Sequence, residues 1–154
     1  MKGYAMNVPH FERRVSSSWP IVVLVVDDSV SFANTLARLL RRREVSVVQA
    51  QDAHEALAYL SSGNIDLVLS DGDMPGIDGV TLLRIVGELW PHVWRVLCTA
   101  YVGTYGAMSQ RYEGAVDCVF EKGQEGEILA LIQSLVQQRL SERLEFEQAL
   151  TPTA

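Results

Sequence analysis

Short apolar runs alternate with segments of helical periodicity along this chain, and this alternation limits its fold more than any other feature. The runs are rich in Val, Ile and Leu, which is typical of strands buried on both faces of a sheet. They cover residues 21–26, 45–50, 65–70, 93–98 and 116–120. The helical segments cover Val30–Arg42, Ala53–Leu60, Val80–Leu89 and 103–112, and a long helix begins near Glu125. Repeated strand–helix units predict an α/β domain whose parallel sheet has helices on both sides.

The connections between the strands restrict the topology further. Right-handed crossovers make such a sheet doubly wound. We adopt the strand order 2-1-3-4-5 from known five-stranded folds of this kind, in which the first and third strands are neighbours. Ligands of these sheets bind outside the carboxyl ends of the strands where the winding reverses. In this chain, those two strands end in Asp27-Asp28 and Asp71.

The length of 154 residues favours one domain with extensions at both ends. Residues 1–19 are polar and mixed, so we expect a flexible N-terminal extension, followed by a domain over residues 20–140. The helical period of the last segment runs from Ile128 to about Phe146, which is longer than one domain requires. We therefore expect residues 141–154 to form a helix extension and a tail.

Composition argues against several classes of protein. The formal net charge is −6, and the one basic run, Arg41–Arg43, is typical of a solvated helix end, so we expect no direct binding to nucleic acid. No apolar run approaches the length of a membrane span, and residues 1–18 lack the apolar stretch of a secretory signal. Cys98 and Cys118 lie in apolar runs without a CxxC spacing, which favours buried free thiols. A cytoplasmic location is the expectation.

Polar residues follow four of the predicted strands at their carboxyl ends. They are Asp27 and Asp28, Asp71, Thr99 and Lys122. Several carboxylates in one crevice repel each other unless a cation is shared, and Mg²⁺ prefers oxygen ligands. We therefore expect Mg²⁺ between Asp28, Asp71 and a nearby backbone carbonyl, with Asp27 reached through water.

A carboxylate beside such an ion can attack phosphorus and form an acyl phosphate. Asp71 is the expected nucleophile, and Lys122 and Thr99 would stabilise the charge of the phosphoryl group. Each residue alone has a simpler explanation: Asp27-Asp28 can cap the next helix, Thr99 can be a turn residue, and Lys122 can be a solvated loop lysine. These explanations do not account for the gathering of all these groups at one edge of the sheet.

The polar motifs resemble those of the receiver domains of two-component response regulators, which have a flavodoxin-like fold. The matching segments are Val25–Ser29, Asp71–Gly79, Cys98–Ala100 and Glu121-Lys122. The resemblance implies that Asp71 accepts a phosphoryl group from a phosphohistidine and that Asp27 and Asp28 bind Mg²⁺. It also implies that Asp73 lends its backbone carbonyl to the metal. Thr99 and Lys122 would then contact the phosphoryl oxygens.

The chain departs from that family at the end of the fifth strand. Gly123 follows Lys122 where the family commonly has proline, and Val119 stands three residues before Lys122, where an aromatic switch residue is usual. Phe120 lies next to that position. Tyr101, two residues after Thr99, is a candidate for part of the switch role and for slowing hydrolysis of an Asp71 phosphate.

The leading hypothesis is a stand-alone receiver without an output domain, which signals through a partner-binding face and has no enzymatic activity beyond its own phosphorylation and dephosphorylation. Its expected partners are a histidine kinase or phosphotransfer protein, a downstream target protein and, through Leu140 and Leu144, a second copy of the chain. The apolar positions at that end can equally belong to a frayed tail. A degenerate receiver that acts as a dimerisation or adaptor module is an alternative. Asp71-Gly72-Asp73 also resembles the nucleophile motif of haloacid dehalogenase phosphatases, a further alternative.

Overall fold

The computed structural model describes residues 20–100 and 112–151, and its described strands form one five-stranded parallel sheet. The strand order is β2-β1-β3-β4-β5, which confirms the predicted topology. The strands are β1 Ile21–Val26, β2 Val45–Ala50, β3 Leu67–Asp71, β4 Trp94–Thr99 and β5 Cys118–Glu121.

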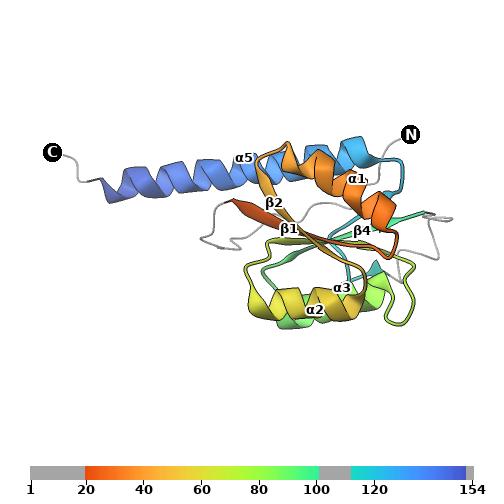
Figure 1. The fold of residues 1–154 in the computed structure, drawn as a ribbon. Coiled ribbons are helices and arrows are strands. Elements are labelled where there is room, and N and C mark those ends of the chain that lie inside the picture. The colour runs from red at the N-terminus through yellow and green to blue at the C-terminus, as the bar shows by residue number, and fades with distance from the viewer. Residues whose placement is uncertain (1–19, 101–111, 152–154) are drawn as a thin grey trace.

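Helices cover both faces of this sheet, as the sequence predicts (Figure 1). They are α1 Val30–Arg41, α2 Ala53–Ser62, α3 Gly79–Leu89 and α5 Glu125–Leu150. Helices α1 and α5 lie on one face, and α2 and α3 lie on the other (Figure 1). The helix expected over residues 103–112 falls outside the described residues except for its last position.

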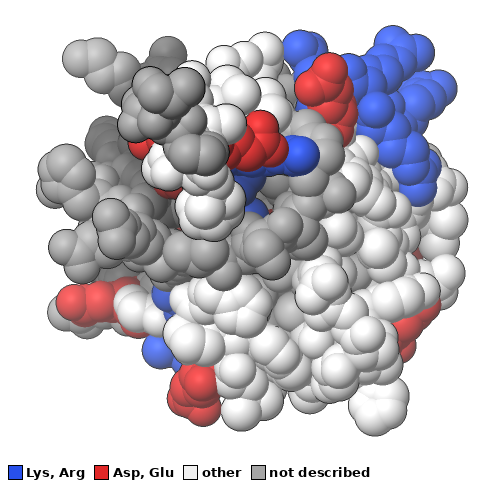
Figure 2. All heavy atoms as spheres, turned by 90° about the vertical axis from the view of Figure 1, so that its left-hand side faces the viewer, with Lys and Arg blue, Asp and Glu red and all other residues white. Residues whose placement is uncertain are grey.

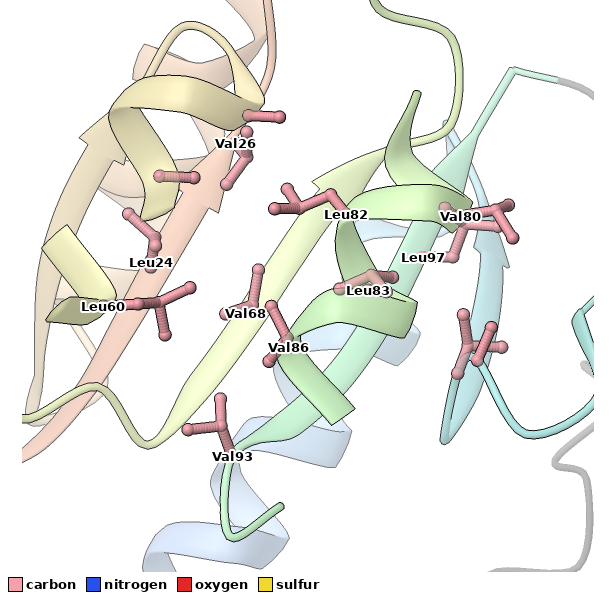
Figure 3. Packing of buried hydrophobic residues seen from close by; sticks show 14 of the residues in the cluster. Leu24, Val26, Leu60, Val68, Val80, Leu82, Leu83, Val86, Val93 and Leu97 are labelled. Carbon is pink, nitrogen blue, oxygen red and sulfur yellow. The ribbon is translucent and has the colours of Figure 1, made fainter. Parts of the chain in front are cut away.

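Two apolar clusters, one on each face, hold the helices against the sheet. On the α2–α3 face, Leu82, Leu83 and Val86 of α3 pack toward Val68 of β3 and Leu97 of β4 (Figure 3). On the other face, the strands pack against Ala33, Leu36 and Leu40 of α1 and against Ile128, Ile132 and Val136 of α5. Because each buried leucine or valine contributes ~1.5–3 kcal/mol, these clusters fix the strands and therefore the edge where they end.

Side chains cap three of the helices at their amino ends. Asp52 accepts a hydrogen bond from the Glu55 backbone at 2.8 Å, and Asp78 accepts one from the Thr81 backbone at 2.8 Å. The cap of α1 is Ser29, whose hydroxyl accepts from the Phe32 backbone at 3.5 Å. The simpler explanation of Asp27-Asp28 as the cap of α1 is therefore wrong for this helix.

Three strands begin and end later than their apolar runs suggest. β3 includes Asp71, which lies in register with Cys98, and β4 includes Thr99, which lies in register with Glu121. The sheet's backbone ladder continues through these polar residues, since backbone pairing does not depend on the side chain. Asp71 and Thr99 are therefore held by the sheet and not by loops. Cys98 and Cys118 are buried and free.

Helix α5 continues well beyond the body of the domain (Figure 1). Its buried residues, Ile128, Ile132 and Val136, all lie in the first half. Leu144, Phe146 and Leu150 have 57%, 64% and 65% of their surface exposed. Among the described helices, none combines the length and hydropathy needed to cross a membrane.

The basic run closes α1, as the sequence suggests. Arg41, Arg42 and Arg43 are exposed, and the Arg43 guanidinium lies 3.5 Å from the Gln133 side-chain oxygen on α5. Figure 2 shows a group of Lys and Arg side chains at the upper right of one face, with acidic side chains scattered elsewhere on it. This face is not uniformly basic.

Candidate functional site

Three carboxylates meet at the carboxyl edge of the sheet. β1 and β3 are neighbours with Val26 opposite Ser70, so Asp27 and Asp71 follow these residues side by side. Carboxylate oxygens of Asp27, Asp28 and Asp71 all lie within 4.8 Å of one another. Asp27 and Asp71 have 2% and 5% of their surface exposed, whereas Asp28 is exposed.

Lys122 supplies the counter-charge of the two buried carboxylates. Its Nζ lies 3.0 Å from Asp27 Oδ2 and 3.3 Å from Asp71 Oδ1. Its backbone N–H donates to the Thr99 carbonyl at 2.8 Å, which ties the lysine to the end of β4. Burial alone would lower the pKa of Lys122, but the ion pairs with Asp27 and Asp71 outweigh it and raise the pKa. The ammonium therefore stays charged at neutral pH.

This arrangement changes the pKa of the Asp71 carboxylate. Burial raises its pKa, and the charge of Asp27 adds to the rise. The charge and hydrogen bond of Lys122, together with a hydrogen bond from the Asp73 backbone, oppose the rise without cancelling it. Asp71 is thus a more basic carboxylate than an exposed aspartate, and its ionised form depends on cations in the site.

Gly79 allows the start of α3 to approach the backbone of Asp71. The Gly79 N–H donates to the Gly72 carbonyl at 3.1 Å, and a Cβ at position 79 would collide with the Asp71 carbonyl oxygen. A Cβ at Gly72 would lie 3.2 Å from Thr99 Oγ1. The motif that contains these glycines was recognisable in the sequence, but their contacts were not.

The remaining predicted site residues lie at the same edge. Thr99 has 4% of its surface exposed and ends β4 beside Gly72. Asp73 follows two residues after Asp71 and its side chain is exposed, so only its backbone is near the buried carboxylates. The three carboxylates, one of them open to solvent, form a set of hard oxygen donors that fits a divalent cation such as Mg²⁺.

Side chains of the following helix hold the loop after Lys122. Gly123 has a φ of 108°, a conformation that proline cannot adopt. The Gln124 side-chain oxygen accepts from the Glu121 N–H at 2.8 Å, and a Glu125 carboxylate oxygen accepts from the Gly123 N–H at 3.0 Å. The loop thus uses side-chain hydrogen bonds where the family commonly has proline, which the sequence did not reveal.

An aromatic ring also contacts the lysine. The Lys122 Nζ lies 4.6 Å from the centre of the Phe32 ring on α1. The sequence pattern of α1 gave no indication of this contact. At the end of β5, Val119 packs on the α2–α3 face and Phe120 packs on the α1–α5 face. Tyr101 lies outside the described residues, so its predicted role is untested.

Comparison with known proteins identifies the domain. Residues 23–133 match the family model of the response regulator receiver domain. The DNA-binding transcriptional regulator NtrC of Salmonella typhimurium is 31% identical over 115 residues, which make up 75% of this chain and 24% of NtrC. ZraR of the same species is 36% identical over 97 residues, or 63% of this chain and 22% of ZraR. The chain thus spans less than a quarter of the length of these relatives.

Solved structures agree with this assignment. The signal receiver domain of an HD domain-containing protein from Pseudomonas fluorescens Pf-5 has a TM-score of 0.70 at 26% identity, covering 84% of this chain and 96% of that chain. The response regulator TrrA of Thermotoga maritima, in complex with Mg(2+)-BeF, has a TM-score of 0.59 at 30% identity, covering 67% and 87%. The chain belongs to the response regulator receiver domains, a family of signalling domains of two-component systems.

Proposed function

We propose that this receiver accepts a phosphoryl group on Asp71 from a phosphohistidine of a sensor kinase or phosphotransfer protein. The observation that carries the proposal is the placement of Asp71 at the end of β3, buried beside Asp27 and within 3.3 Å of the Lys122 ammonium. A carboxylate with a raised pKa and a cation beside it is suited to attack phosphorus and to keep the transferred group.

In the proposed transfer, an Asp71 carboxylate oxygen forms a bond to phosphorus as the P–N bond of the phosphohistidine breaks. The electron pair of that bond returns to the imidazole nitrogen, which is left free to take up a proton. Lys122 is placed to follow the new charge, because its Nζ already contacts Asp71 Oδ1. The Thr99 hydroxyl, buried at the end of β4, would donate to a phosphoryl oxygen.

Mg²⁺ is the expected cofactor. The carboxylates of Asp27, Asp28 and Asp71 would hold it together with the backbone carbonyl of Asp73. A bound Mg²⁺ would supply positive charge against the carboxylates and the phosphoryl oxygens. The complex of TrrA with Mg(2+)-BeF supports this assignment by analogy.

The output of the domain would pass to a partner protein. The surface of the domain would exist in two conformations, phosphorylation would shift the population between them, and the partner would bind one of them preferentially. The face expected to carry the change includes β5, which ends immediately before Lys122, and α5, which begins three residues after it. NtrC and ZraR are transcriptional regulators, so we include a protein of transcriptional regulation among the proposed partners of this chain.

Self-association through α5 is a second proposed property, compatible with the adaptor alternative. The exposed apolar residues Leu144, Phe146 and Leu150 lie on the half of the helix beyond the body of the domain and favour it. The haloacid dehalogenase alternative is not retained, because the chain belongs to the receiver family.

Incubation with acetyl phosphate and Mg²⁺, followed by intact mass measurement, tests the proposed function. We expect the mass of one phosphoryl group to be added to the unmodified chain and no addition to Asp71→Asn. Omission of Mg²⁺ should abolish the addition. A chain that gains no mass would leave the adaptor module as the function, and a gain that persists in Asp71→Asn would place the chemistry elsewhere.

A further inference from the structure

We propose that Phe32 is a positioning residue whose ring holds the Lys122 ammonium between Asp27 and Asp71. The proposal rests on the function proposed for Asp71. The Nζ of Lys122 lies 4.6 Å from the ring centre, within the distance at which an aromatic face attracts a cation. Phe32 lies in the first turn of α1, far in sequence from the lysine that it contacts.

The ammonium needs such a support because its carboxylate partners do not fix it completely. A lysine ammonium is a compact charge on a flexible stem with three donors. Two of its contacts are to Asp27 Oδ2 and Asp71 Oδ1. The Lys122 side chain is 24% exposed, so without the ring it would have room to turn toward solvent. The ring is thus a third neighbour of the ammonium, in addition to the two carboxylates.

The ring itself is held in place by the same turn that orients Asp27. Phe32 is half-buried and packs against the apolar cluster on the α1–α5 face. Its backbone N–H donates to the Ser29 hydroxyl at 3.5 Å, and the Ser29 N–H donates to Asp27 Oδ1 at 2.8 Å. The first turn of α1 and its cap residue Ser29 therefore place both the Phe32 ring and the Asp27 carboxylate beside Lys122, which follows β5.

This arrangement is suited to phosphoryl transfer because the lysine must change partners. After transfer, the Asp71 oxygen is bonded to phosphorus and the ammonium has to contact a phosphoryl oxygen instead. An aromatic face attracts a cation over a broad area, whereas a hydrogen bond requires a fixed acceptor position. The ring can therefore hold the ammonium before and after the transfer.

Fluorinated phenylalanines at position 32 test the proposal without changing the shape of the ring much. Each fluorine weakens the attraction of the ring for a cation, so the rate of phosphorylation by acetyl phosphate should fall stepwise with one, two and three fluorines. We expect a total decrease of about two- to five-fold, and a similar decrease in Phe32→Leu. The same series of fluorinated phenylalanines at position 59, in place of the exposed Tyr59 on α2, is the control and should leave the rate unchanged.

A second measurement uses the protein without any phosphoryl group. The aromatic ring should shift the NMR signals of the Lys122 ε-methylene protons upfield, and Phe32→Leu should abolish this shift. A rate that does not respond to fluorination, or ε-protons at the position of an exposed lysine, would overturn the role of Phe32. If the unmodified chain is not phosphorylated at all, the proposed function itself fails, whereas a flat fluorine series in a chain that is phosphorylated removes only the role of Phe32.

Discussion

At the scale of single residues, the site is a balance between two buried carboxylates and one ammonium. Asp27 and Asp71 are nearly inaccessible to water, and Lys122 lies between them at 3.0 and 3.3 Å. Buried like charges are unfavourable unless a cation neutralises them. The lysine therefore has a structural role in addition to the chemical role that we propose for it.

Replacing Lys122 by Met, which keeps the length of the stem and removes the charge, should destabilise the fold. We expect the free energy of unfolding, measured with urea in EDTA, to fall by about 1–3 kcal/mol, because two carboxylates lose their counter-charge. Added Mg²⁺ should restore part of the loss by binding to the folded state. The control is Arg143→Met, which breaks an exposed pair with Glu147 and should change stability by less than about 0.5 kcal/mol. Equal effects of the two substitutions would contradict this account.

The raised pKa of Asp71 predicts how stability depends on pH without metal. The folded protein holds the Asp71 proton more tightly than the unfolded chain, in which the pKa of this carboxyl group is near 3.8. The contribution of Asp71 to stability therefore falls as the pH rises from this value through the higher pKa of the folded state. Above that window the loss is complete. The stability of Asp71→Asn relative to the unmodified chain should therefore increase across the window in urea titrations with EDTA. A difference that is constant with pH, or that decreases, would show that the pKa is not raised.

At the scale of elements, the sequence predicts strands well where apolar residues continue to their ends. β1 and β2 have the bounds that the apolar runs suggest, whereas β3 and β4 extend into Asp71 and Thr99, since pairing with Cys98 and Glu121 continues the ladder. With the strand order adopted from known folds, the positions of the predicted strand ends were enough to predict that the polar residues meet at one edge of the sheet.

The side-chain contacts around Lys122 and Gly123 could not be predicted from the sequence pattern as the strand ends could. The approach of Phe32 to Lys122 joins α1 to the end of β5, and no local periodicity signals it. The loop at Gly123 depends on Gln124 and Glu125 side chains that turn back onto the backbone. Such contacts follow from tertiary packing and not from the pattern of any one element.

Gly79→Ala tests the close approach of α3 to β3. The added methyl group would collide with the Asp71 carbonyl oxygen, so we expect a loss of about 2–4 kcal/mol in the free energy of unfolding and slower phosphorylation. The control is Gly126→Ala in α5, where a Cβ has open space and a helical position favours alanine. That control should be neutral or stabilising by up to about 1 kcal/mol. If Gly79→Ala were also neutral, the strands and α3 would have to be further apart than described.

At the scale of the whole molecule, the edge of the sheet that carries the carboxylates lies apart from the far half of α5, which extends away from the sheet. The carboxylates lie at the carboxyl ends of the strands, while the far half of α5 carries exposed apolar residues (Figure 1). Arg139 on α5 lies 3.6 Å from the buried Asp66, so the helix is anchored to the sheet up to that point. Leu140, expected to take part in association, packs instead against the apolar cluster on the α1–α5 face, so the part of α5 beyond Leu140 is the candidate for association with a second copy.

Sedimentation of a variant with Leu144→Glu and Phe146→Glu tests this association. We expect the unmodified chain to form dimers with increasing concentration and the variant to remain monomeric, because both side chains would place charges in an apolar contact. These positions are exposed, so the fold should be retained. The same mass for both chains at every concentration would remove α5 as the contact between copies.

Locating the phosphoryl group tests most directly whether Asp71 is its acceptor. After incubation with acetyl phosphate and Mg²⁺, reduction with borohydride converts a phosphorylated aspartate into homoserine, which peptide mass spectrometry assigns to a position. We expect homoserine at position 71 and aspartate at positions 27, 28 and 73. Homoserine at any of those three positions, or its absence throughout the chain, would contradict this expectation.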